Sequence, residues 1–142
     1  MNNAATPLDF SALGKALASL NRALVRWQAS QCLDEELRDA CIQRFEYTFE
    51  LSWKMLKRQL ELDLPDAQGV DALSFRDLIR IGAERSLVQD ADAWMLFRDK
   101  RNTTSHTYNE AKAADVAAVI PAFATHAAEL HERLQARGAA HG

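Results

Sequence analysis

Residues 9–27 read DFSALGKALASLNRALVRW, and the apolar residues in this stretch recur at intervals of three and four. This spacing places them on one face of an α-helix of about five turns, with Asp9 as its N-cap. The stripe consists of Phe10, Leu13, Leu17, Leu20, Leu24 and Trp27. A stripe this regular is typical of helices that pack side by side in a bundle.

A second helix is predicted between Asp34 and Pro65. Asp34 is a suitable N-cap, and the helix must end before the proline because the residue preceding a proline disfavours helix. The inward stripe of this helix contains Cys41, Phe45, Phe49, Ser52, Leu56 and Leu60. Residues 64–69 are interpreted as a break in helical structure, after which Ser74 caps one short helix.

Two more helices follow along the chain. Asp90 opens one helix whose buried face carries Trp94 and Phe97, and Asn109 opens the last helix. The apolar stripe of the last helix contains Val116, Ile120, Phe123, Ala127, Leu130 and Leu134. This stripe keeps its phase across Pro121, which predicts a kink rather than a stop.

These patterns predict an all-α fold, an antiparallel up-down bundle of four long helices and one short one. The length of 142 residues fits one domain. We expect this domain to span residues 8–137, between a loose leader at 1–7 and a frayed tail at 138–142. Gly138 is the expected end of the last helix.

Composition narrows the functional classes. The chain is 48% hydrophobic and 26% charged, as expected for a globular protein, and its net charge of −3 argues against a protein that coats duplex DNA. No apolar run approaches a membrane span and no signal peptide is evident, so we expect a cytoplasmic location. Cys32 and Cys41 lack metal or redox spacing and are predicted to be reduced thiols. No metal or nucleotide-cofactor motif is present.

The stretch RNTTSHTY at residues 101–108 joins the last two helices. Arg101 lies two turns after Trp94 on the same helix face, where an arginine must find a partner or line a cleft. Because residues five apart in a straight helix point about 140° apart, Arg101 and His106 can share a site only if the helix ends between them. The intervening hydroxyl side chains favour such an end. If the next residues are extended, His106 and Tyr108 face one side together.

A cation beside a titratable imidazole is suited to RNA cleavage without a metal. The imidazole of His106 can take a proton from a ribose 2′-hydroxyl or give one to the leaving oxygen. The guanidinium of Arg101 can stabilise charge on the phosphoryl oxygens. An arginine and a histidine this close also occur by chance, so a purely structural role, in which both close the helix end, stays open.

Charged residues elsewhere accompany this stretch. Glu46 and Glu50 share a face of the second helix, which is either a solvated face with weak ion pairs or a face that orients the Arg–His stretch. Glu50 and Asn102 are the candidate orienting groups. Candidate phosphate- or RNA-binding residues are Lys54, Lys57, Arg58, Arg98 and Lys100.

The chain resembles the HEPN-domain proteins of the nucleotidyltransferase substrate-binding family, the HepT-like toxins. Arg101, His106 and Tyr108 match the R-x4-H-x-Y signature of HEPN domains that are paired with minimal nucleotidyltransferases. Residues 43–54, QRFEYTFELSWK, are similar to the second-helix block of the same family. The resemblance extends over roughly residues 8–137.

This resemblance implies a homodimeric helical bundle with its Arg–His motifs near the dimer cleft and no cofactor. Many members act as metal-independent endoribonucleases and as the toxin of a toxin–antitoxin pair, which implies catalytic roles for Arg101 and His106. The antitoxin is a minimal nucleotidyltransferase that can AMPylate the motif tyrosine, here Tyr108, and silence the toxin. Other members are substrate- or nucleotide-binding subunits without demonstrated catalysis, so this alternative stays open.

Overall fold

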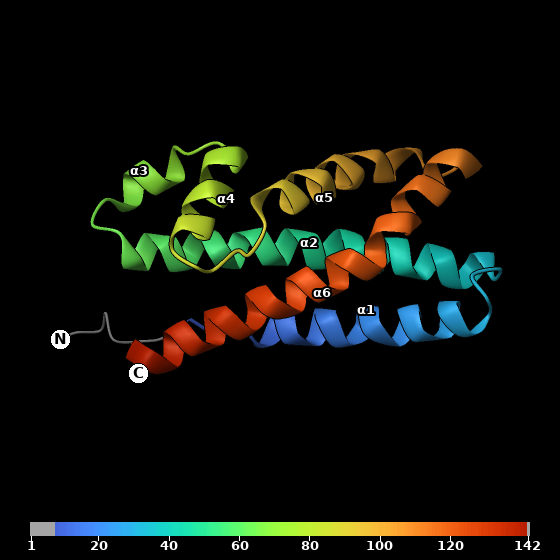
Figure 1. The fold of residues 1–142 in the computed structure, drawn as a ribbon, viewed down its shortest axis with the longest axis horizontal. Helices are drawn as coiled ribbons and strands as arrows, with labels where there is room; N and C mark the ends of the chain where they lie inside the picture. Colours follow the sequence, from blue (N-terminus) through green and yellow to red (C-terminus); the bar gives the residue numbers. More distant parts are fainter. Residues whose placement is uncertain (1–7, 142) are drawn as a thin grey trace.

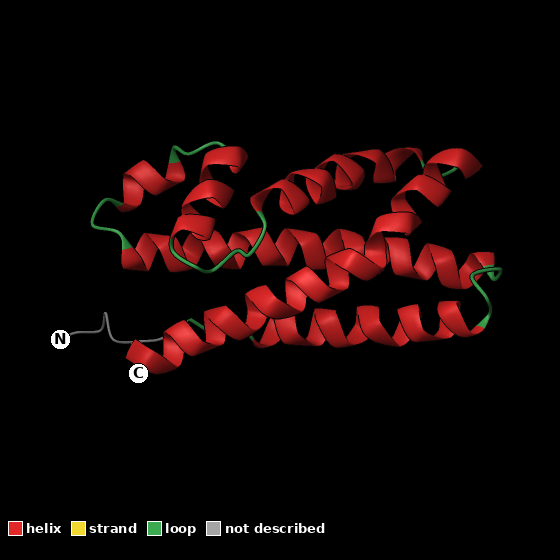
Figure 2. Ribbon diagram, viewed as in Figure 1, coloured by secondary structure: helices red, strands yellow, loops and turns green. Residues whose placement is uncertain are grey.

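The computed structural model describes residues 8–141, which form helices joined by short connections (Figure 1, Figure 2). The elements are α1 Ser11–Ala29, α2 Glu35–Asp63, α3 Ala67–Asp71, α4 Phe75–Glu84, α5 Ala91–Thr103, the 3₁₀ turn η2 Thr104–His106 and α6 Glu110–His141. No residue in this part of the chain is in a strand, so the all-α prediction is confirmed. None of the described helices combines the length and hydropathy needed to cross a bilayer. The leader predicted at residues 1–7 lies outside the described residues, as does Gly142.

Four helix starts follow the predicted caps, and the N-cap of α1 is Phe10 instead of the predicted Asp9. The side chains of Asp34, Ser74 and Asp90 each accept a hydrogen bond from the backbone N–H three residues later, at 3.0, 3.1 and 3.1 Å. Asn109 does the same for α6 at 3.2 Å. Asp9 lies one residue before the N-cap of α1, and its carboxylate accepts an N–H two residues later at 2.9 Å. These side chains satisfy amide groups that have no partner within the helix.

α2 is the central helix of the bundle. α1 runs antiparallel along one side of it, α3, α4 and α5 cover the opposite side, and α6 crosses the length of the molecule (Figure 1). Every residue of the three predicted long stripes is buried. The sequence pattern therefore identified the inward faces of α1, α2 and α6 correctly.

Aromatic rings join α2, α5 and α6 in the core. The ring of Phe123 on α6 lies edge-on to Phe45 of α2, with centroids 4.9 Å apart. The same ring lies 5.8 Å from Trp94 and 5.3 Å from Phe97, both on α5. Phe49 of α2 completes the cluster at 6.3 Å from Phe123. The cluster fixes α5 against α2 with one face inward.

The connections between helices depart from prediction in two places. Residues 64–69 are only partly a break, because α3 starts within them; two short helices therefore lie between α2 and α5 instead of one. The Asp66 carboxylate caps α3 by accepting the Gly69 N–H at 2.9 Å, and a Cβ at Gly69 would lie 2.6 Å from that carboxylate. α6 continues beyond Gly138 to His141 because Gly138 does not adopt the left-handed conformation that ends a helix. The helix also runs through Pro121 without stopping, as predicted.

The two cysteines are free thiols, as predicted. Cys32 is exposed in the connection between α1 and α2, and Cys41 is buried on α2. Burial raises the pKa of the Cys41 thiol to about 11, so this side chain is protonated and unreactive near neutral pH.

An ion pair ties the end of α6 to the end of α2. Arg137 pairs with Asp63 through Nη1, and its Nη2 donates to the backbone carbonyl of Arg85 at 3.0 Å. The second carboxylate oxygen of Asp63 accepts a hydrogen bond from the Gln59 amide at 2.8 Å. The Asp63 side chain is only 8% exposed, so its charge depends on these partners.

We expect Arg137→Ala to lower the free energy of unfolding by about 2 kcal/mol, less than a fully buried pair loses because Arg137 keeps some exposure. The loss arises because the Asp63 carboxylate stays buried without its cation. Urea unfolding measures the change. Arg133→Ala, one turn earlier on α6 and with a more exposed side chain, is the matched control and should cost no more than about 0.5 kcal/mol. Equal losses in the two variants would contradict the role of the pair.

Candidate functional site

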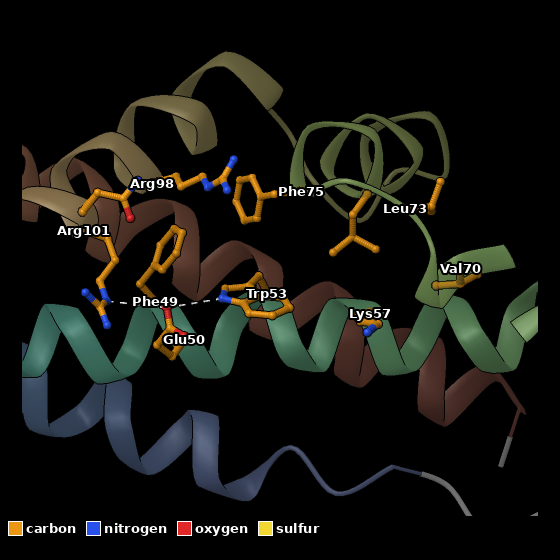
Figure 3. A pocket seen from close by; sticks show the side chains of 11 residues that line it. Phe49, Glu50, Trp53, Lys57, Val70, Leu73, Phe75, Arg98 and Arg101 are labelled. Atoms are coloured by element: carbon orange, nitrogen blue, oxygen red, sulfur yellow. Dashed lines mark hydrogen bonds and ion pairs between the residues drawn. The ribbon is translucent and has the colours of Figure 1, made fainter. Parts of the chain in front are cut away.

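Arg101 lies on α5 and points toward α2 (Figure 3). Its Nη1 is 3.5 Å from an oxygen of Glu46, and its Nε is 3.5 Å from an oxygen of Glu50. Nη1 also donates to the hydroxyl of Thr104 at 3.2 Å. The Nε atom is buried and makes no hydrogen bond within residues 8–141. Of the two alternatives left open for the Glu46–Glu50 face, one placed a carboxylate near this guanidinium, and the structure brings two there.

α5 ends at Thr103, between Arg101 and His106, as the hydroxyl-rich sequence predicts. Thr103 donates its hydroxyl to the carbonyl one turn earlier at 3.1 Å. Thr104 donates to the Arg101 carbonyl at 2.8 Å, and Thr107 donates to the Thr104 carbonyl at 3.1 Å. These bonds satisfy carbonyls at the helix end and close the chain into a 3₁₀ turn. The segment after the helix is therefore a 3₁₀ turn, so the condition of an extended segment is not met.

His106 and Tyr108 lie together on this turn. Their ring centroids are 6.3 Å apart with an interplanar angle of 70°. Both residues are exposed, and Tyr108 is 85% exposed. Neither side chain forms a hydrogen bond or ion pair with Arg101 within residues 8–141. The turn does not fold His106 back onto Arg101 in a single chain, because the guanidinium points toward α2.

A cavity of about 460 Å³ lies beside Arg101, between α2 and the layer of α3, α4 and α5 (Figure 3). Its lining residues are Phe49, Glu50, Trp53, Lys57, Val70, Leu73, Phe75, Leu78, Arg98, Arg101 and Asn102. His106 and Tyr108 are not among them. The predicted site is thus divided between this cavity and the exposed turn. Within residues 8–141, no three histidine, cysteine, aspartate or glutamate side chains gather as a metal site would require.

Two of the predicted phosphate-binding residues line this cavity. Lys57 donates a hydrogen bond to the Asp71 carboxylate at 2.6 Å, which raises the pKa of Lys57 and lowers the pKa of Asp71. Arg98 places its guanidinium carbon 4.9 Å from the ring centroid of Phe75, a cation–π distance. Arg98 makes no ion pair in the described part of the chain and is free to bind an anion.

The other predicted basic residues lie outside the cavity lining. Lys100 pairs with Asp115 on α6 at 2.6 Å, so it fastens α5 to α6. The Lys54 ammonium lies 5.8 Å from the ring centroid of Trp53. Arg58 is exposed on α2. Among these predicted basic residues, Lys57 and Lys100 are therefore held in ion pairs. Lys54, Arg58 and Arg98 make no ion pair within residues 8–141.

Residues 8–136 match the family described as "Nucleotidyltransferase substrate binding protein like". The chain belongs to this family. The match covers the bundle up to residue 136 of α6, so the cavity and the Arg–His–Tyr turn are both parts of the family domain.

Named relatives agree with this membership. The chain is 36% identical over 137 residues to "Probable ribonuclease HepT" of Haemophilus influenzae, covering 92% of this chain and 94% of that protein. The structure of HI0074 from Haemophilus influenzae, described as the fold of a substrate binding domain of a nucleotidyltransferase, matches with a TM-score of 0.85 and 34% identity over 89% of this chain and 99% of that one. A crystal structure from Thermus thermophilus matches with a TM-score of 0.64 and 33% identity over 89% and 98%.

The aromatic wall of the cavity is the feature of this family member that sequence reasoning missed. Trp53 and Phe75 lie edge to face with centroids 6.4 Å apart and an interplanar angle of 81°. The indole N–H of Trp53 donates to Glu50 at 3.4 Å. The available signal was the position of Trp53 off the core stripe of α2, which indicates a second contact surface. The partner of that surface, the α4 residue Phe75, could not be inferred from spacing.

The chain has two tyrosines, which permit a direct test of the exposed turn. We expect tetranitromethane to nitrate Tyr108 several-fold faster than Tyr47. Tyr47 is only 39% exposed and donates its hydroxyl to Ser19 at 2.9 Å. Peptide mapping by mass spectrometry measures the two rates, with Tyr108→Phe as control. Slower reaction at Tyr108 would show that the turn is covered in solution.

Proposed function

We propose that this protein is a HEPN toxin, a metal-independent endoribonuclease that a minimal nucleotidyltransferase silences by AMPylating Tyr108. The observation that carries the proposal is the placement of Arg101 at a cation-rich cavity directly before the exposed turn that holds His106 and Tyr108. The similarity to a protein named probable ribonuclease HepT supports the ribonuclease activity. The family description supports a nucleotidyltransferase as partner.

In the proposed cleavage, His106 takes the proton from a ribose 2′-hydroxyl. The 2′-oxygen forms a bond to the adjacent phosphorus, and the bond from phosphorus to the 5′-oxygen of the next nucleotide breaks. The proton that His106 took then passes to that 5′-oxygen, which leaves a 2′,3′-cyclic phosphate on one product, a 5′-hydroxyl on the other and a neutral imidazole. Arg101 stabilises the charge on the phosphoryl oxygens, and Glu46 and Glu50 hold its guanidinium in position.

A homodimer fits the observed separation of the two motif residues. Within one chain, Arg101 points toward α2 while His106 is exposed on the turn. Two protomers that face each other through these turns would bring both Arg–His pairs to one cleft. An RNA strand in that cleft could contact the guanidinium and the imidazole together.

The exposure of Tyr108 fits its proposed role as the site of modification. The phenolic oxygen forms a bond to the α-phosphorus of ATP held by the nucleotidyltransferase, pyrophosphate leaves, and the phenolic proton passes to solvent. The added AMP carries negative charge and bulk beside His106 and Arg101. It would compete with the RNA phosphate for the cations and block access to the imidazole.

The second candidate is a non-catalytic subunit that binds substrate or nucleotide for the transferase. The favouring observation is electrostatic, because two carboxylates lie 3.5 Å from the Arg101 guanidinium and compete with any phosphate. The net charge of −3 also favours this role over a general ribonuclease. The description of HI0074 as a substrate binding domain is consistent with it.

We expect Arg101→Ala and His106→Ala each to abolish the growth arrest caused by expression of the protein. Loss of a general acid or base reduces the cleavage rate by about 100-fold or more. Growth curves and cleavage of a labelled RNA measure the effect, and circular dichroism checks that the bundle folds. Ser105→Ala, in the same exposed turn, is the matched control and should remain toxic. Undiminished toxicity of His106→Ala would refute the catalytic assignment.

We expect co-expression with the partner nucleotidyltransferase to add the mass of one or more AMP units to the protein. Intact-mass spectrometry measures the gain, and Tyr108→Phe should lose it while Tyr47→Phe keeps it. A protein that forms a stable complex with the transferase, gains no mass and cleaves no RNA would instead support the binding-subunit role.

A further inference from the structure

The cavity beside Arg101 has two chemically different ends (Figure 3). Val70 and Leu73 lie at one end, together with Lys57, whose ammonium is paired with Asp71, and Arg98 and Arg101 form the other, cationic end. The aromatic side chains lie between the two ends. An anionic molecule with a flat apolar part could place its anionic group at the two arginines and its flat part against the aromatic side chains.

We propose that this cavity binds one unpaired nucleotide, with its base against Trp53 and Phe75 and its phosphate at Arg98 and Arg101. This inference rests on the proposed function and specifies the substrate as single-stranded. The proposed cleavage and AMPylation at His106 and Tyr108 do not require this pocket, because neither residue lines it.

The aromatic side chains are placed to receive a base. Trp53 and Phe75 are only partly buried, unlike the core rings of Phe45 and Phe123, so part of their surface faces the cavity. The Arg98 guanidinium carbon already lies 4.9 Å from the Phe75 ring centroid, so a base would use the part of that ring that Arg98 leaves open. A base stacked on aromatic rings is bound whatever its sequence, because every base has a π-face. The amide of Asn102 at the rim can donate to or accept from a base edge.

The charges of the lining fit a phosphate. Arg98 has no carboxylate partner within residues 8–141, whereas Arg101 lies 3.5 Å from both Glu46 and Glu50 and keeps 29% exposure of its side chain. The only carboxylate of the lining is Glu50, which Arg101 and Trp53 already engage. A bound phosphate therefore meets Arg98 without an opposing carboxylate, and it competes with Glu46 and Glu50 for the exposed part of Arg101.

Size and position fit the same ligand. The volume of about 460 Å³ falls within the roughly 300–1,000 Å³ of small-molecule sites. Arg101 belongs both to the cavity and to the stretch that carries His106. A strand that places one base in the cavity therefore leads its neighbouring phosphate toward the turn. Base insertion would also require an unpaired strand, because bases within a duplex are stacked on each other.

The test measures binding of three probes by calorimetry: AMP, ribose 5-phosphate, and a short 2′-O-methyl RNA strand that lacks the attacking hydroxyl. We expect AMP to bind roughly 10-fold or more tightly than ribose 5-phosphate because of base stacking. Trp53→Ala should remove this difference, and Arg98→Ala should weaken both probes. Arg22→Ala removes the same charge from the exposed surface of α1, away from the cavity, and should change neither. Binding should quench fluorescence of Trp53, since Trp27 and Trp94 are buried.

The outcomes separate the inference from the proposed function. Equal affinity for AMP and ribose 5-phosphate, or base-dependent binding that survives Trp53→Ala, overturns the pocket assignment even if the protein cleaves RNA. Base-dependent binding lost in Trp53→Ala supports the assignment even if no cleavage occurs. If the 2′-O-methyl RNA strand binds more tightly than AMP, the pocket is assigned to RNA. If AMP binds more tightly than the strand, the pocket is assigned to a free nucleotide. Circular dichroism of each variant checks that the bundle is folded.

Discussion

The packing of Phe123 against α2 and α5 is the contact on which the rest of the structure depends. Its ring lies 4.9 Å from Phe45 and 5.3 Å from Phe97, so one residue of α6 joins the central helix to the helix that carries Arg101. Once Trp94 and Phe97 are buried, the rotation of α5 about its axis is set. Arg101, two turns after Trp94, must then point toward α2. The hydrophobic core thereby decides where the charged group of the candidate site lies.

The surroundings of Arg101 resolve an electrostatic conflict on α2. Glu46 and Glu50 are one turn apart, and like charges at this spacing destabilise a helix by about 0.2–0.5 kcal/mol. The guanidinium lies 3.5 Å from both carboxylates and offsets their repulsion. At 29% exposure, it also keeps contact with solvent. The arrangement holds the arginine in place while leaving part of it available to an incoming phosphate.

At the turn after α5, the local sequence predicted where the helix ends but not the conformation of the residues that follow. Three threonines in residues 103–107 predicted the helix end, and their hydroxyls donate to nearby carbonyls as such residues do. The same hydroxyl bonds produce a 3₁₀ turn, which the sequence pattern did not distinguish from an extended segment. α3 was missed for a related reason: proline and glycine mark a break, yet Asp66 caps a short helix within it.

The sequence by itself determined the all-α class, the inward faces of the long helices, most of their caps and the family, because these depend on periodicity and on residues close together in the chain. Only the tertiary structure decided that Arg101 meets two carboxylates, that Arg98 covers Phe75, and that Trp53 and Phe75 form one wall of a cavity. These contacts join α2, α4 and α5, and no local pattern specifies which faces of three helices meet. Their geometry follows from how the buried side chains pack between the helices.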